Sequence, residues 1–346
     1  MADQDVLSKA EVLRAQMADF EAAGIDEMGP CPDDLEEAWI DIEVKDGWKS
    51  RTSVVWPKSP SSQRLPLIVY FYGGGFTAGS PNMVRAPARG FASLLQCVVA
   101  CPTYKLAPEH PFPAPMQSGW EVCAWLSEPA NLNNGLLKDT KSKIDLDLGF
   151  VVGGVSAGGT ISAVIGGIMT ASGGGMSDIL GGLPALKSPI TGIFTGVQFL
   201  VEEETVPTEL KSLFRSRKEN DDFYGQQTAN IRAMIATAKI DLKSPWCSPT
   251  NLTINKDDFA KHHPKRVFAY GGEEDPFRDD AVVYAEWLKS TMGVDSRYLV
   301  LRGEDHIAWA TPKWPSSHSK LIKETTLNAM GWLLQKDWDK SRELPY

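Results

Sequence analysis

The stretch LGFVVGGVSAGG, residues 148–159, joins a short apolar run to a turn rich in glycine. An apolar run without polar interruption is typical of a strand that is buried on both faces of a parallel sheet. The glycines allow a sharp turn, and residues 157–171 are then predicted to form a helix. Gly154, Ser156 and Gly158 fit the pattern G-x-S-x-G, in which such a turn exposes the serine hydroxyl. We therefore expect Ser156 to stand at a strand–turn–helix junction.

Strands and helices are predicted to alternate on both sides of this junction. Further strands are expected at 38–44, 50–56, 66–72, 97–104, 190–201, 266–272 and 296–303, and further helices at 8–23, 85–95, 116–127, 279–291 and 319–336. This alternation predicts a mainly parallel sheet with helices on both faces, and the first two strands form a hairpin that adds an antiparallel edge. Residues 173–182 are expected to be a loop. The charged, mostly helical segment 202–250 is expected to be an insertion over the sheet.

Composition and charge argue against several classes of protein. The chain has 346 residues, of which 42% are hydrophobic and 23% are charged, as in an ordinary globular protein with a large core. Its net charge of −9 argues against nucleic acid or an anionic membrane as the main partner. No apolar run approaches the roughly 20 residues that a membrane span needs. Residues 1–20 lack the apolar run of a signal peptide.

The cysteines are scattered and form no C-x-x-C pair, which argues against a zinc site or a dithiol redox centre. Thiols of this kind fit a reducing compartment, so a cytoplasmic location is expected. No motif implies a metal or an organic cofactor, and the sequence leaves a monomer and a homodimer open. The cysteines are Cys31, Cys97, Cys101, Cys123 and Cys247.

Residues that can take part in catalysis follow the predicted core strands at the points where the strands end. Gly73–Gly75 follow one strand, and Ser156, Asp275 and His306 follow three that we expect to be successive core strands. Because ligands bind at the carboxyl ends of the strands in open α/β sheets, these residues are expected to meet at one edge. The chain order serine, acid, histidine is that of the α/β-hydrolase arrangement.

These residue types supply the parts of a nucleophilic hydrolysis site. A serine hydroxyl becomes a good nucleophile when a base takes its proton, and His306 is the predicted base for Ser156. Asp275 is expected to hold the imidazole in one tautomer and to stabilise its cation. The oxyanion that forms during attack needs hydrogen-bond donors, which the backbone N–H groups of Gly73–Gly75 and Ala157 can supply.

Each of these assignments has a structural alternative. A lone G-x-S-x-G arises by chance, and a glycine-rich turn before a helix also suits phosphate, although no G-K-[ST] occurs. Helix N-capping is the alternative role for the acidic group around Asp275. Replacing Asp279 or Asp280 is expected to matter little. Glu273 and Glu274 are acidic neighbours of Asp275. The other histidines lie outside the turns at strand ends, and they are His110, His262, His263 and His318.

Several segments resemble the hormone-sensitive-lipase-like α/β-hydrolases, which are mostly carboxylesterases that act on small or medium esters. The resemblance spans about residues 39 to 337, and the motifs occur in the family's order. The segments are YGGGF (72–76), YKLAPEHPFPAP (104–115), GVSAGG (154–159), DPFRDD (275–280) and the late His306.

The resemblance implies roles for individual residues and for the segments outside the sheet. It implies one catalytic domain over residues 38–346, with residues 1–37 and 202–250 as a helical cap. The implied triad is Ser156, Asp275 and His306, and the implied oxyanion hole is Gly74, Gly75 and Ala157.

Two residues depart from the family pattern. Tyr72 precedes the three glycines, where the family usually has histidine, and Val155 precedes Ser156, where it usually has an acidic residue. Neither change removes a catalytic group. Tyr72 either orients the oxyanion loop through its hydroxyl or simply packs.

The cap is expected to exclude water and to bound a pocket with apolar side chains. Core packing is the alternative role for the aromatic candidates in 202–250. The candidate substrate-binding residues are Tyr72, Phe76, Phe214 and Trp246, with Met17 and Phe20 as further wall residues.

The sequence thus predicts a serine hydrolase that cleaves an ester or lactone of a small, largely uncharged molecule through an acyl-enzyme. A lyase, cyclase or acyltransferase of specialised metabolism using the same residues is the alternative. A catalytically silent binder is the third reading, and the complete triad argues against it. Residues 183–197 resemble filamentous-fungal relatives, among which biosynthetic-cluster hydrolases are common.

Overall fold

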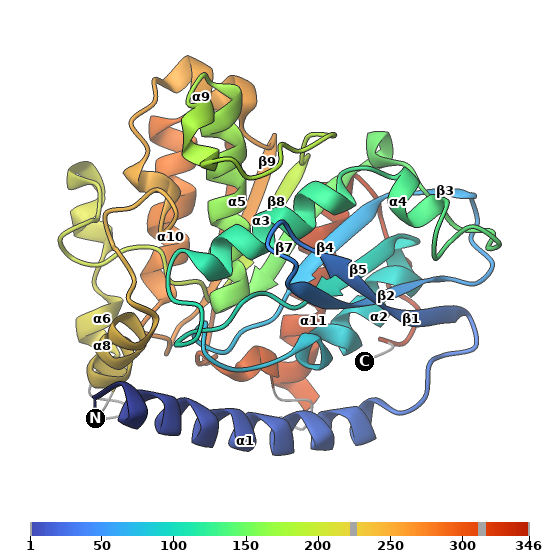
Figure 1. Cartoon of the computed structure of the whole chain (residues 1–346), viewed down its shortest axis with the longest axis horizontal. Coiled ribbons are helices and arrows are strands. Elements are labelled where there is room, and N and C mark those ends of the chain that lie inside the picture. Colours follow the sequence, from blue (N-terminus) through green and yellow to red (C-terminus); the bar gives the residue numbers. More distant parts are fainter. Residues whose placement is uncertain (1, 222–226, 311–315, 345–346) are drawn as a thin grey trace.

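The chain folds around an eight-stranded sheet, and a computed structural model describes residues 2–221, 227–310 and 316–344 (Figure 1). The strands are β1 (Leu35–Glu43), β2 (Lys49–Pro57), β4 (Leu67–Phe71), β5 (Val98–Pro102), β7 (Phe150–Val155), β8 (Gly192–Gly196), β9 (Arg266–Gly272) and β10 (Asp295–Leu301). Their order is β1-β2-β5-β4-β7-β8-β9-β10. The pairs β1–β2 and β2–β5 are antiparallel, and the other neighbours are parallel.

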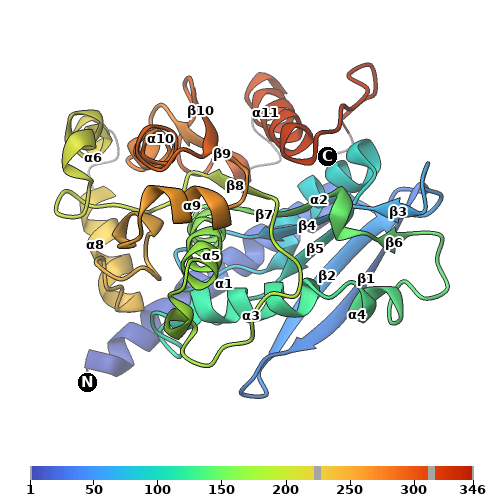
Figure 2. The ribbon, with the colours of Figure 1, turned by 90° about the horizontal axis from the view of Figure 1, so that it is seen from above.

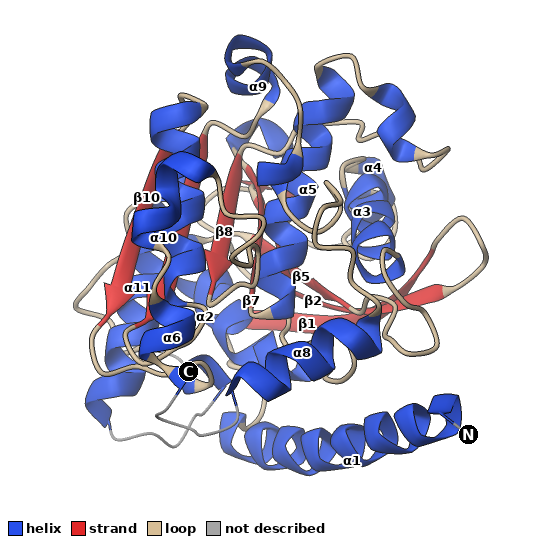
Figure 3. Cartoon of the chain, turned by 90° about the vertical axis from the view of Figure 1, so that its left-hand side faces the viewer, coloured by secondary structure: helices blue, strands red, loops and turns tan. Residues whose placement is uncertain are grey.

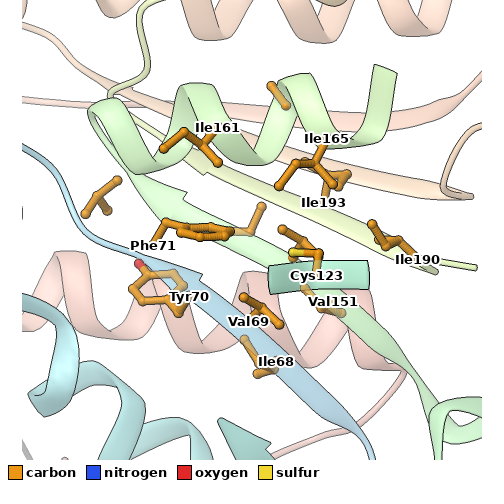
Figure 4. Packing of buried hydrophobic residues seen from close by; sticks show 14 of the residues in the cluster. Ile68, Val69, Tyr70, Phe71, Cys123, Val151, Ile161, Ile165, Ile190 and Ile193 are labelled. Atoms are coloured by element: carbon orange, nitrogen blue, oxygen red, sulfur yellow. The ribbon is translucent and has the colours of Figure 1, made fainter. Parts of the chain in front are cut away.

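Helices cover both faces of this sheet (Figure 2). One face packs against α2 (Arg85–Leu95) and α11 (Ser316–Leu334), and the other packs against α3 (Ala114–Leu126), α5 (Ala157–Gly173) and α10 (Arg278–Glu286). The central strands β4, β5, β7 and β8 are buried along their whole length, which explains their apolar sequences. Figure 4 shows the core between α5 and the strands, where side chains of β4, β7 and α5 interlock.

Three helices lie across the ends towards which the arrows of the parallel strands point (Figure 3). They are α1 (Ala2–Met28), α6 (Ser216–Glu219) and α8 (Gln227–Ala238). Smaller elements complete the described chain. They are β3 (Arg64–Leu65) paired with β6 (Lys143–Ile144), α4 (Ala130–Asn133), α9 (Lys256–His262), the short 3₁₀ segments Pro81–Val84, Leu146–Leu148, Ser177–Leu180, Thr208–Leu213, Pro249–Asn251 and Ala308–Ala310, and a π-helical turn at Trp287–Thr291. Within the described part of the chain, no helix combines the length and the apolar character that crossing a bilayer demands.

Most predicted elements agree with the structure within a few residues, and three expectations are wrong. The strand expected at 190–201 is only β8, because Val197 has a φ of 46° and turns the chain away. The helix expected at 279–291 ends at Glu286 and continues as a π-helical turn. Segment 202–250 contains two described α-helices, α6 and α8, and the 3₁₀ turn Thr208–Leu213 before α6, and the loop at 173–182 contains the 3₁₀ turn Ser177–Leu180. The strands before Ser156, Asp275 and His306 are not three successive strands, because β8 separates β7 from β9.

Candidate active site

Ser156 stands between the end of β7 and the start of α5, in a backbone conformation that non-glycine residues seldom adopt. Its φ is 53° and its ψ is −122°, and its N–H donates to the carbonyl oxygen of Gly196 on β8 (2.7 Å). A Cβ atom added at Gly158 would lie 2.3 Å from the carbonyl oxygen of Phe71, and one at Gly154 would lie 2.5 Å from the carbonyl of Gly158. The turn therefore requires the glycines on both sides of Ser156.

The structure brings Ser156, His306 and Asp275 into one line of hydrogen bonds. The Oγ of Ser156 lies 2.9 Å from Nε2 of His306, and Nδ1 of His306 lies 3.0 Å from Oδ2 of Asp275. Asp275 is fully buried, and its other oxygen accepts from the N–H of Phe277 (2.8 Å). The His306 side chain is 23% exposed and is the most exposed member of the line.

The electrostatic surroundings favour a basic imidazole at His306. Burial by itself lowers the pKa of this ring, because it removes water from the cationic form. The charge of Asp275 and its hydrogen bond outweigh burial, so the pKa of His306 lies above its ordinary value. A base of this kind suits removal of a hydroxyl proton near neutral pH.

The glycine loop after β4 lies directly beside Ser156. A Cβ atom added at Gly73 would lie 2.9 Å from the Cβ of Ser156. Gly74 has a φ of 126° and a carbonyl of Ala78 against it, and Gly75 has a φ of 59°, so both positions need glycine. The N–H groups of Gly74 and Gly75 have no acceptor among the residues that the structure describes. They are available to an oxyanion.

Ala157 completes the set of backbone donors expected at the site. It is the first residue of α5, so its N–H has no partner within the helix. It directly follows Ser156, and helix N-termini favour negative charge.

Tyr72 packs in the core next to the glycine loop. Its ring is 1% exposed and stacks on the ring of Tyr104, with centroids 4.5 Å apart and planes at 19°. The hydroxyl of Tyr104 donates to the carbonyl oxygen of Tyr72 (3.1 Å). Of the two roles expected for Tyr72, the structure shows packing. The loop is further held by Arg14 of α1, whose Nε donates to the carbonyl oxygen of Thr77 (2.8 Å).

The other expected pocket residues differ in how far they are buried. Phe76 and Trp246 are 1% and 8% exposed and belong to the hydrophobic core. Phe214 is partly buried and lines a cleft between segment 202–219 and α8. On α1, Phe20 is 38% exposed and Met17 is half-buried.

The cleft beside α8 has a volume of ≈ 1090 Å³ and mixes apolar walls with charged residues of both signs. Ser156, Asp275 and His306 are not among the residues that line this cleft. Its apolar lining consists of Val206, Phe214, Ile231, Ile235, Ala236 and Leu242.

Two residues at the site were not found from the sequence. Trp309 lies three residues after His306, and its ring is 2.5 Å from the position of a Cβ atom at Gly73, so the indole packs on the glycine loop. Met234 of α8 lies 3.6 Å from the corresponding position at Gly75. The spacing of Ile231, Met234 and Ala238 was the available signal, because it places three apolar residues on one helix face.

The aspartates after Asp275, which are Asp279 and Asp280, accept more hydrogen bonds than expected. Asp280 is fully buried, and its Oδ1 accepts from the N–H groups of Leu200 and Val201 (2.7 and 3.1 Å). Oδ2 of Asp279 accepts from two backbone N–H groups of the cap segment. These contacts bear on stability, and the expectation that replacing either residue changes turnover little stays a prediction. In residues 2–221, 227–310 and 316–344, no three His, Cys, Asp or Glu side chains form a group that fits a metal ion.

Comparison with known proteins gives a family. A family model described as the alpha/beta hydrolase fold matches residues 68–310, which is more than half of the chain. The chain belongs to the α/β-hydrolase family. Its curated relatives include versiconal hemiacetal acetate esterase of Dothistroma septosporum, 27% identical over 79% of this chain and 74% of the relative. Carboxylesterase NlhH of Mycobacterium tuberculosis is 31% identical over 68% of this chain and 64% of that protein.

Solved structures agree on the architecture of this α/β-hydrolase. A crystal structure of vibralactone cyclase superposes with a TM-score of 0.74 at 22% identity, over 93% of this chain and 89% of that one. At this identity the likeness shows the fold. Together with the esterase relatives, the family match identifies a hydrolase of the carboxylesterase type in the hormone-sensitive-lipase-like group.

Proposed function

We propose that this α/β-hydrolase cleaves an ester through a covalent acyl-enzyme on Ser156. His306 takes the hydroxyl proton as Oγ attacks the ester carbonyl, and it gives that proton to the departing alcohol. Water, activated by the same imidazole, then attacks the acyl carbon and releases the acid and Ser156. The observation that carries this proposal is the unbroken line of hydrogen bonds from buried Asp275 through His306 to Ser156.

The oxyanion of both tetrahedral intermediates is proposed to be held by the N–H groups of Gly74, Gly75 and Ala157. The unpaired amides of the loop and of the helix start support this role. Each such donor typically stabilises the transition state by about 3–4 kcal/mol.

The proposed substrate is a small or moderately sized ester without charge. Six of the residues that line the cleft are apolar, and its five basic residues are nearly balanced by four acidic ones, which supports a substrate without charge. One relative is named for an acetate ester, which supports a short acyl group as the first to test. The elements α1, α6 and α8 are proposed to form the cap over this substrate. All five cysteines are unpaired, which supports a reducing compartment such as the cytoplasm.

The test uses Ser156→Ala with a series of p-nitrophenyl esters from acetate to octanoate. We expect ester turnover to fall by at least about 10³-fold while circular dichroism stays unchanged. A fluorophosphonate probe is expected to label the wild-type chain at Ser156 and to leave the variant unlabelled. Ser290→Ala, at an exposed serine, is the control and keeps both signals. Full activity of Ser156→Ala would refute the proposal.

A cyclase or acyltransferase reaction is the second candidate, because a neighbour in structure is named vibralactone cyclase. In that case a hydroxyl of the substrate or of a second molecule replaces water as the acceptor of the acyl group. Fluorophosphonate labelling at Ser156 without hydrolysis of any ester in the series would favour this candidate.

A further inference from the structure

Helix α6 of the cap is fastened to the turn that carries Asp275. The N–H of Ser216 donates to Oδ2 of Asp279 (2.7 Å), and the hydroxyl of Ser216 donates to the carbonyl oxygen of Pro276 (2.7 Å). Nδ2 of Asn220 donates to the carbonyl oxygen of Asp275 itself (2.8 Å). Helix α6 and the turn that carries Asp275 are therefore joined by hydrogen bonds into one unit.

Arg217 of the same helix lies inside this unit, with a side chain only 14% exposed. Its guanidinium pairs with Oε1 of Glu202 (3.0 Å) and Oδ2 of Asp280 (2.9 Å). It also donates to the carbonyl oxygens of Val201 (2.9 Å) and of Pro276. A planar guanidinium with this many partners holds one orientation, which a lysine ammonium would not reproduce.

The guanidinium of Arg217 reaches the catalytic histidine through one aromatic ring. It lies over the ring of Phe277 at 4.6 Å from the centroid. The ring of Phe277 also contacts the ring of His306, with centroids 5.0 Å apart and planes at 77°. The N–H of Phe277 donates to Oδ1 of Asp275 (2.8 Å). Phe277 thus touches both members of the His306–Asp275 pair.

We propose that Arg217 is a positioning residue for the His306–Asp275 pair, and that it acts through Phe277 and Pro276. The cap then sets the geometry of the base as well as the shape of the pocket. This inference rests on the proposed function, because it assigns a role in the ester cleavage carried out by Ser156.

The charge of Arg217 adds a second, measurable consequence. Burial lowers the pKa of His306, the carboxylates of Asp275 and Asp305 raise it, and the positive charge of Arg217 opposes them. Removing that charge therefore raises the pKa of His306. Since the neutral imidazole is the base, the acid limb of kcat/KM moves to higher pH.

The experiment compares Arg217→Met, Arg217→Lys and Arg278→Met. Arg278 is a matched control: its side chain is also 14% exposed, and it also joins α6 to α10, through Glu219 (2.6 Å) and Asp279 (2.8 Å). Arg278 follows Phe277 in the chain, but within the described residues its guanidinium does not lie over the Phe277 ring as that of Arg217 does. For each variant, we would measure the melting temperature and the pH profiles of kcat and KM for p-nitrophenyl acetate.

We expect Arg217→Met to lower kcat by about 10- to 100-fold, to change KM less than kcat, and to move the acid limb to higher pH. Arg217→Lys keeps the charge, so its acid limb stays in place while kcat still falls. Arg278→Met lowers the melting temperature without moving the limb.

Three results would overturn the inference. They are a wild-type kcat in Arg217→Lys, an unmoved acid limb in a folded Arg217→Met, and equal kinetic effects in Arg217→Met and Arg278→Met. If Arg217→Met does not fold, the kcat of Arg217→Lys decides alone.

A readout without ester turnover separates this inference from the proposed function. The pKa of His306 can be followed by NMR of the imidazole ring, since the chain has 5 histidines and a His306→Gln spectrum assigns the signal. An active Ser156→Ala would refute the proposed hydrolysis and leave this titration interpretable. An unchanged titration in Arg217→Met would refute the charge effect of Arg217 and leave the proposed hydrolysis intact.

Discussion

The carboxylate of Asp275 is the group on which the orientation of His306 depends. It is fully buried, and its Oδ2 lies 3.0 Å from Nδ1 of His306. In Asp275→Asn the amide favours the wrong imidazole tautomer, so we expect ester turnover to fall on the order of 10⁴-fold with the fold intact. The charge of Asp275 raises the pKa of His306 against burial, so its loss should move the acid limb of kcat/KM to lower pH. A pH–rate profile measures both effects.

The neighbouring aspartates provide the contrast for this prediction. Asp279→Asn or Asp280→Asn should lower the melting temperature, because each replaces a charged acceptor of two backbone N–H groups with a neutral amide and removes an ion pair with an arginine. Asp41→Asn, at a half-exposed carboxylate on β1, is the neutral control. If the pH profile of Asp279→Asn shifts and that of Asp275→Asn does not, the assignment of the acid is wrong.

His263 makes stability depend on pH away from the active site. Burial lowers its pKa from 6.5 to about 4, although its Nδ1 bonds the carbonyl oxygen of Pro264. Between these two pH values His263 binds a proton in the unfolded chain but not in the folded chain. The free energy of unfolding therefore falls as the pH falls from 6.5 to 4. The shift corresponds to an upper limit of about 3 kcal/mol.

The measurement for His263 is urea unfolding at a series of pH values. His263→Phe should keep the stacking on Phe259, where the ring centroids are 4.8 Å apart, and should flatten the pH dependence between 4 and 6.5. His262→Gln, at the preceding residue and the last of α9, serves as the control. An equally steep dependence in His263→Phe would show that other groups cause it.

At the scale of elements, the oxyanion loop depends on the strand and the loop beneath it. Tyr104→Phe keeps the stacked ring of Tyr104 and removes the hydroxyl that donates to the carbonyl oxygen of Tyr72. A buried carbonyl without a donor costs about 1–3 kcal/mol, so we expect a lower melting temperature and a reduced kcat with little change in KM. Tyr298→Phe, at an exposed tyrosine of β10, should do neither. Unchanged stability in Tyr104→Phe would mean that water replaces the hydroxyl.

The elements that the sequence predicted well are those whose ends carry a local signal. Strand β9 ends as predicted, before the acidic turn with Asp275, and α2 has the predicted bounds. The run at 190–201 is apolar throughout, and periodicity cannot show where pairing stops in such a run. The end of β8 is set by the positive φ of Val197 and by pairing with β9, which are tertiary facts.

The same distinction holds at the site. Ser156, Asp275 and His306 could be predicted because each follows a strand, and parallel strands bring their carboxyl ends together. The role inferred for Arg217 could not be predicted in this way. Its partner Glu202 follows β8, whereas Phe277 and Asp280 lie at the start of α10, and only the docking of α6 on the turn after Asp275 joins these two segments.

At the scale of the whole molecule, α1 is the part of the chain with the least support from the sheet. It lies along the outside of the fold (Figure 1), and Leu13 and Phe20 are 39% and 38% exposed. Its firmest attachment is Arg14, which donates to the carbonyl oxygens of Thr77 and Ala107 and pairs with Glu109. The helix is therefore expected to contribute more to the oxyanion loop than to the stability of the core.

Deleting residues 1–28 tests whether α1 acts on the glycine loop more than on the stability of the core. The deletion removes α1 but keeps Glu37 of β1, which pairs with Arg85 and Arg89 of α2 and belongs to the core domain. We expect the melting temperature to fall by a few degrees at most, and ester turnover or chain-length selectivity to change by about 10-fold or more, because the backbone of the loop at Thr77 loses a charged donor. Arg14→Gln in the full chain should reproduce much of the kinetic effect, whereas Arg64→Gln, at an exposed arginine of β3, should not. Unchanged turnover of both short and long esters in the truncated chain would show that α1 is not part of the cap.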